Sequence, residues 1–154
     1  MIQEATIEAT LDRLENSIDT LDEQVQDLAS QQPELLGYLT NEDVEAFTES
    51  ERDILLFAAV VIYESVRAEG GGRRAITGKA LTEAEERHYE LIQQTKGPFR
   101  ERVTPFFEQS EEEELLAFVE DLTISETEGN GALSNEAREP FFVTLATVVE
   151  VLTR

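Results

Sequence analysis

The sequence contains no cysteine and only one histidine, His88, among its 154 residues. Without cysteine the chain forms no disulfide, binds no metal through thiolates and has no thiol nucleophile. A single histidine also excludes any site that takes two imidazoles from one chain. These two absences remove several common classes of catalytic and metal site before any pattern is considered.

Basic residues are also scarce: 12 Lys and Arg stand against 34 Asp and Glu, for a net charge of −22, and only two of the 12 are lysine. Such a chain repels itself at low ionic strength, and it is repelled by nucleic acid and by anionic lipid. Many carboxylates with little lysine and no cysteine are typical of proteins from salt-accumulating halophiles. We therefore expect halophilic adaptation, the alternative being an ordinary acidic helical protein of a low-salt cytoplasm.

Long apolar runs are missing as well. The longest covers residues 54–63, whereas a membrane span needs about 20 apolar residues. The first four residues lack the basic flank and apolar stretch of an export signal, so we expect a cytoplasmic protein. Leu, Ile, Val and Phe nevertheless provide 44 residues, enough for one folded domain over residues 1–154.

The apolar residues that are present follow helical spacing. One heptad seam has spacings of four and three throughout, and it predicts a single helix of three heptads. Its members are Ile7, Leu11, Leu14, Ile18, Leu21, Val25 and Leu28. Residues 54–63 are apolar on all sides, which predicts a central helix over residues 50–69 that ends at Gly70. The sequence thus predicts an all-α, single-domain bundle of five to six helices around that central helix.

Capping residues indicate where these helices begin. The expected starts are Thr48 with Glu51, Thr82 with Glu85, and Ser110 with Glu113. Pro140 either begins the last helix or lies inside a longer one that starts at Asn135. Together, the heptad seam and the apolar face of residues 141–152 present more apolar surface than we expect one small bundle to bury. We therefore predict a homodimer, or another protein partner that covers them.

Glu85 and His88 have the Glu-x-x-His spacing of di-iron helical bundles, but those sites use the motif twice. We expect His88 to be buried, to hydrogen-bond to Glu85 or to a backbone carbonyl, and to bind no metal. Glu64 follows the apolar run, and we expect it to pair with Arg67 one turn later. No serine or threonine has a recognisable base beside it. The sequence therefore predicts neither an enzyme nor a cofactor.

We expect residues 70–80 to form a flexible loop, which carries four glycines, two arginines and Lys79 and lies in the chain's one net-positive stretch. Residues 67–105 have a net charge of +2, whereas the remainder has −24. The loop is not a Walker A motif, for two reasons. Gly72 and Gly78 are one residue farther apart than the two glycines of that motif, and Ala80 stands where the motif has the Ser or Thr that binds magnesium. Three consecutive glycines offer the fold little to pack, so we interpret the loop as functional. The predicted anion- or partner-binding residues are Arg73, Arg74, Lys79, Arg100 and Arg102.

Three functions are compatible with these patterns. The first is a non-enzymatic helical protein that acts through protein–protein contacts. The alternative is a helical module that binds a phosphate-bearing ligand or an anionic partner through residues 70–79 and the basic residues nearby. The third is an enzyme that uses carboxylates, Glu64 and Glu85 among them. For the loop itself, the alternative to a binding site is a connector whose arginines pair with the chain's own carboxylates, such as those at 111–114.

The net charge generates a test of the halophile hypothesis. Raising KCl from about 0.1 M to about 2 M shortens the Debye length from about 10 Å to less than 3 Å, so self-repulsion in the folded state largely disappears. The melting temperature, followed by circular dichroism, should rise substantially over this range. A melting temperature that stays flat or falls would contradict the hypothesis.

Overall fold

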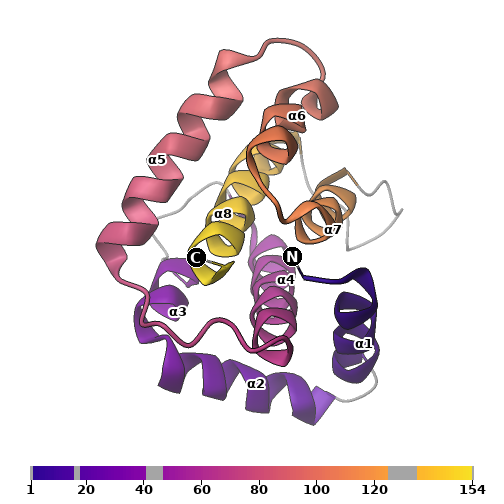
Figure 1. Cartoon of the computed structure of the whole chain (residues 1–154), viewed down its shortest axis with the longest axis vertical. Helices are drawn as coiled ribbons and strands as arrows, with labels where there is room; N and C mark the ends of the chain where they lie inside the picture. The colour runs from indigo at the N-terminus through magenta and orange to yellow at the C-terminus, as the bar shows by residue number, and fades with distance from the viewer. Residues whose placement is uncertain (1, 16–17, 41–46, 125–134, 154) are drawn as a thin grey trace.

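The computed structural model describes residues 2–15, 18–40, 47–124 and 135–153, and over these ranges it contains eight helices and no strand (Figure 1). The helices are α1 (Glu4–Glu15), α2 (Ile18–Gln31), α3 (Pro33–Leu39), α4 (Glu49–Ala68), α5 (Gly78–Gln94), α6 (Phe99–Gln109), α7 (Glu113–Ile124) and α8 (Asn135–Thr153). The predicted all-α class is confirmed, although five to six helices was too low a number. None of the described helices combines the length and the apolarity needed to cross a bilayer.

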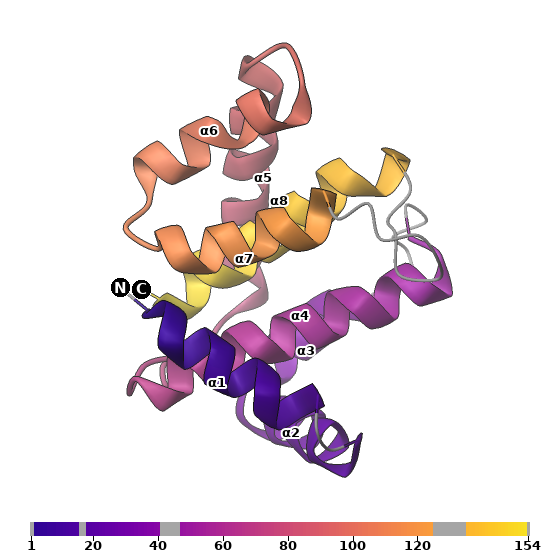
Figure 2. The ribbon, with the colours of Figure 1, turned by 90° about the vertical axis from the view of Figure 1, so that its right-hand side faces the viewer.

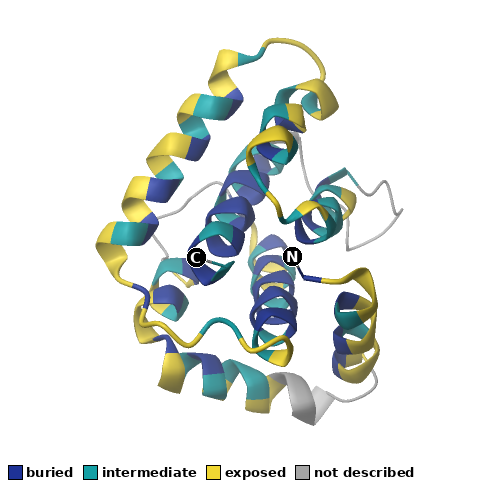
Figure 3. Ribbon diagram, viewed as in Figure 1, coloured by how far each residue is buried: buried dark blue, intermediate teal, exposed yellow. Residues whose placement is uncertain are grey.

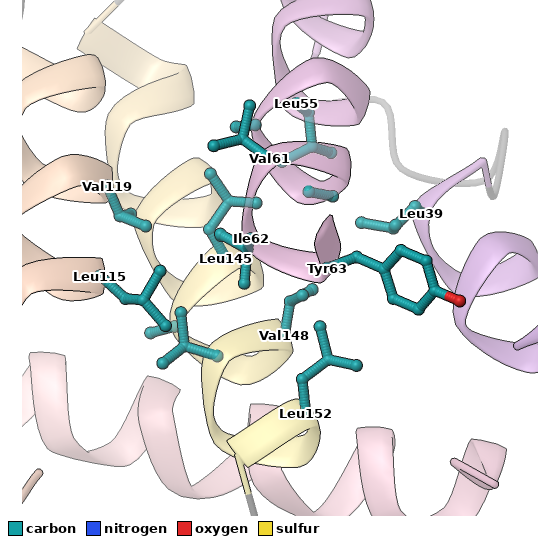
Figure 4. Close-up of a cluster of buried hydrophobic side chains, with 14 of the residues drawn as sticks. Leu39, Leu55, Val61, Ile62, Tyr63, Leu115, Val119, Leu145, Val148 and Leu152 are labelled. Atoms are coloured by element: carbon teal, nitrogen blue, oxygen red, sulfur yellow. The ribbon is translucent and has the colours of Figure 1, made fainter. Parts of the chain in front are cut away.

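The centre of the bundle is a pair of helices, α4 and α8, rather than one central helix. Helix α8 packs against α4, α5 and α7, and its residues 141–149 are almost completely buried (Figures 1 and 3). Val61 and Ile62 of α4 lie close to Leu145 and Val148 of α8 in the close-up of the core (Figure 4). The first half of α4 differs from expectation, because Leu56 and Phe57 are only partly buried.

The heptad seam does not form one helix. It is divided between α1 and α2, which run at a steep angle to each other (Figure 1). The sequence contains Asn16 and Ser17 at this point, residue types that favour helix caps over helix interiors. The division lets Ile7 and Leu14 of α1 and Leu28 of α2 all become buried, and both helices pack against α4. The side chains of the seam residues Ile18 and Leu21 lie outside the described part.

The two apolar faces that motivated the homodimer are covered in large part within the single chain. The seam residues Ile7, Leu14 and Leu28 are at most 4% exposed, whereas the seam residues Leu11 and Val25 are only partly buried. Helix α8 packs against α4, α5 and α7, which bury its apolar face. The face of α8 therefore gives the homodimer no support, and the homodimer stays a prediction.

Helix starts agree with the capping residues in part. Thr48 and Glu51 form the predicted capping box at the start of α4. Helix α5 begins a turn earlier than expected, because Thr77 accepts a hydrogen bond from the amide of Ala80 and acts as its N-cap. Pro140 lies inside α8, so the longer of the two expected helices is the one that forms.

Candidate functional site

The glycine–arginine loop, residues 70–77, crosses from α4 to α5 past the junction of α2 and α3 (Figure 1). At that junction the side chain of Gln32 is 2% exposed and holds the loop at three points. Its Nε2 donates to the carbonyl oxygens of Gly72, at 3.1 Å, and Arg74, at 2.9 Å. Its Oε1 accepts from the amide of Ile76 at 2.9 Å. One buried amide therefore fixes the path of the loop backbone.

The three glycines have structural roles of their own. Gly70 and Gly72 have φ values of 91° and 73°, in the left-handed region that side chains disfavour. A Cβ on Gly71 would lie 2.9 Å from Cγ1 of Val66, which is too close without a shift. The expectation that the fold gains little from these glycines is therefore wrong: the chain needs them to leave α4 closely packed. The flexibility predicted for the loop stays a prediction, and the Gln32 hydrogen bonds argue against it because motion would have to break them.

Several backbone amides around the loop already have acceptors in the chain. Besides Ile76, the amides of Gly70 and Gly71 donate to carbonyl oxygens of α4. The amide of Gly78 donates to Oε2 of Glu34 at 3.0 Å, so a carboxylate of α3 lies at the N-terminus of α5. The N-terminus of a helix attracts phosphate, and a phosphate bound here would have to displace the carboxylate of Glu34. The backbone is thus poorly arranged as a phosphate cradle.

The cationic side chains of the loop and of the first turn of α5 face solvent, as predicted. Arg73, Arg74 and Lys79 are all exposed, and Lys79 pairs only loosely with Glu83, at 3.9 Å. Within the described residues, neither Arg73 nor Arg74 forms an ion pair with a carboxylate. The connector interpretation, in which these arginines pair with the chain's own acidic residues, therefore has no support in the described contacts.

Arg100 and Arg102 do not join this surface. They lie on α6, beyond the far end of α5, and 17 residues of helix correspond to about 25 Å. Arg102 is structural: its guanidinium pairs with Glu139 of α8 at 3.2 Å and donates to the carbonyl oxygen of Ile92 at 3.3 Å. Arg100 is exposed, and its charge partly offsets the burial that raises the pKa of Glu120. The predicted set of five residues thus separates into two places.

His88 is buried, as predicted, but its interactions differ from those expected. Its Nδ1 lies 3.0 Å from Oγ1 of Thr147, and that hydroxyl donates to the carbonyl oxygen of Val143. The threonine oxygen is therefore the acceptor, and the ring donates from Nδ1. Glu85, the expected partner, instead accepts a hydrogen bond from the hydroxyl of Tyr38. No group of three or more His, Asp or Glu residues suited to a metal occurs in the described ranges.

Glu64 pairs with a different helix from the one expected. Its Oε2 lies 3.3 Å from the guanidinium of Arg13 on α1. Arg67, the expected partner, lies over the ring of Tyr63, 5.7 Å from the ring centroid. Burial raises the pKa of Glu64, and the charge of Arg13 opposes that increase. The carboxylate therefore joins α4 to α1.

The chain matches no family model, no curated protein and no solved structure. Its function has to be argued from the residues themselves. Sequence reasoning located the exposed arginines but missed Gln32, the residue that positions them. A lone glutamine before a proline carries no recognisable signal, because its importance depends on a loop that lies 40 residues later in the chain.

Replacing Gln32 with alanine tests whether this side chain holds the loop. The change removes the partners of the buried amide of Ile76 and of the part-buried carbonyl oxygens of Gly72 and Arg74, which costs about 1–3 kcal/mol. We expect the free energy of unfolding, measured with urea, to fall by that amount. The neighbouring exposed Gln31→Ala variant is the control and should change it by about 0.5 kcal/mol or less. Equal effects of the two variants would show that Gln32 has no special role.

Proposed function

We propose that this chain is a non-enzymatic helical binding protein, which contacts a short acidic segment of a protein partner through Arg73 and Arg74. One observation carries the proposal: Gln32 holds the loop backbone from inside, while both arginines are exposed and form no ion pair within the described residues. In a chain of net charge −22, carboxylates are abundant enough to pair with every arginine. Two arginines held apart from them are available to another molecule.

The chemistry of arginine favours a carboxylate partner. The planar guanidinium donates two parallel hydrogen bonds to one carboxylate, and these are stronger than bonds between neutral groups. Because the loop backbone is already fixed, binding orders only the side chains. The entropic cost is therefore smaller than for a loop that folds on contact.

The remaining surface restricts how the partner can bind. An acidic partner is repelled by the other carboxylates of the chain, so the contact has to be local. In concentrated salt this repulsion extends only about 3 Å, whereas hydrogen bonds at contact distance are screened much less. A short acidic segment reaching the loop therefore fits better than a broad acidic face.

A phosphate-bearing ligand is less well supported. The amides of Ile76, Gly78 and Ala80 already donate to acceptors in the chain, and the carboxylate of Glu34 lies at the helix end that a phosphate would use. The exposed side chains of Arg73, Arg74 and Lys79 stay available to it. We therefore place this alternative among the outcomes of the test.

The test measures binding of a fluorescently labelled octaglutamate peptide by anisotropy, with tripolyphosphate as a second probe. We expect saturable peptide binding that weakens by about tenfold or more in R73A/R74A, because each lost charge-assisted contact contributes about 1.5 kcal/mol or more. The control K96A/R100A removes two exposed positive charges elsewhere and should leave binding unchanged.

Three results would contradict the proposal. The first is no saturable binding of the peptide, and the second is an equal loss of binding in the control variant. The third is binding of tripolyphosphate but not of the peptide, which would favour the phosphate ligand. The free energy of unfolding of R73A/R74A should match that of the unmodified chain. A decrease of about 1–3 kcal/mol would assign the arginines to the fold instead.

A further inference from the structure

A second candidate site lies along the second half of α5, between Arg87 and Gln94. A cleft of about 570 Å³ opens between α5, the α6–α7 connection and the end of α8. Its volume is within the range of pockets that bind small molecules. The geometry points to a binding site for a small organic cation with an apolar body. This inference does not depend on the arginine loop.

The floor of the cleft is apolar and is built from several helices. It is formed by Phe106 of α6, Leu116 of α7, and Ala146 and Val149 of α8. His88 of α5 lies beside Phe106, with their ring centroids 5.3 Å apart. These floor residues are at most 9% exposed, so the protein packing fixes their positions. The floor therefore stays in place when a ligand enters, and the partly buried side chain of Leu91 adds apolar lining beside it.

One wall of the cleft contains a closed ion pair. Arg87 donates two hydrogen bonds to the carboxylate of Glu150, at 2.9 and 2.6 Å. Oε1 of the same carboxylate lies 3.8 Å from Nε2 of His88. The charge of Arg87 is thus neutralised within the chain. An anionic ligand would have to break this bidentate contact before it could use the guanidinium.

The other charged groups that line the cleft are all carboxylates: Glu90 of α5, and Glu111 and Glu112 before α7. Glu112 accepts a hydrogen bond from the amide of Ile2, which holds the carboxylate in place. Glu90 and Glu111 are exposed at the rim. Arg87 and Glu150 cancel, and the two exposed carboxylates of Glu90 and Glu111 give the rim a charge of −2. A cation is attracted to this rim and an anion is repelled.

Carboxylates are common along the whole chain, so an acidic rim alone does not indicate a binding site. What distinguishes this place is a cavity of ligand size over a buried apolar floor, with a negative rim above it. A neutral ligand gains only the apolar contact, whereas an amine with an aliphatic or aromatic body satisfies both parts. The class of ligand is therefore an amphiphilic amine rather than a metal ion or a free phosphate.

The single histidine makes the test unusually direct. Because His88 lines the cleft and no other histidine occurs in the sequence, its ring C–H resonances in a proton NMR spectrum report on this site alone. The probes are phenethylamine, 2-phenylethanol and 3-phenylpropanoate, which share an aromatic body and differ in charge. At constant pH we expect a saturable shift of the His88 resonances with the amine. The alcohol should bind more weakly, and the carboxylate should cause no saturable shift.

Two variants locate the contact. E90Q/E111Q removes the exposed rim charges and should weaken amine binding by about fivefold, as expected for two screened ion pairs. Its matched control, E8Q/E23Q, removes two exposed carboxylates from α1 and α2 and should have no effect. Gln94→Trp fills the mouth of the cleft from an exposed position and should abolish binding without disturbing the core.

The inference fails if the amine gives no saturable shift, or if all three probes shift His88 equally. It also fails if the control pair weakens binding as much as E90Q/E111Q, because the amine would then sense only the overall charge. Retention of full affinity in Gln94→Trp would likewise place the amine outside the cleft.

Discussion

Helix α8 depends on being enclosed, and the arrangement of the other helices follows from that constraint. Its segment from Phe141 to Val149 is apolar almost without interruption, so it needs neighbours on every side. Helix α4 supplies one apolar surface, and the amphipathic helices α5 and α7 each place one face against α8 (Figure 2). Each fully buried Phe, Leu or Val contributes about 1.5–3 kcal/mol to the free energy of unfolding. The packing of α4 against α8 is therefore the main source of stability.

Buried polar side chains then fix how the surrounding parts meet this core. His88 of α5 is joined to Thr147 of α8, and Gln32 joins the start of α3 to the loop before α5. Such groups are costly to bury unless they are hydrogen-bonded. Each hydrogen-bonded contact therefore favours the one arrangement of the two elements that satisfies its polar groups. Both proposed binding surfaces lie next to one of these contacts: the arginine loop next to Gln32, and the cleft next to His88.

Local patterns in the sequence predicted the local structure well. The all-α class, the burial of His88 and the exposure of Arg73 followed from spacing and composition. The long-range contacts did not, because they depend on which helices meet. Two examples are the division of the seam into α1 and α2 and the pairing of Glu64 with Arg13 rather than Arg67. For the same reason Arg102 was assigned to the site, although it joins α6 to Glu139 of α8.

A buried glutamine holds the arginine loop in one position, and amide hydrogen exchange at Ile76 is the measurement that checks this. That amide donates to Oε1 of Gln32 and belongs to no helix. We expect slow exchange in the unmodified chain and much faster exchange in Gln32→Ala, with the amides inside α4 and α8 unaffected. Fast exchange of Ile76 in the unmodified chain would show that the loop moves freely, and it would contradict the claim.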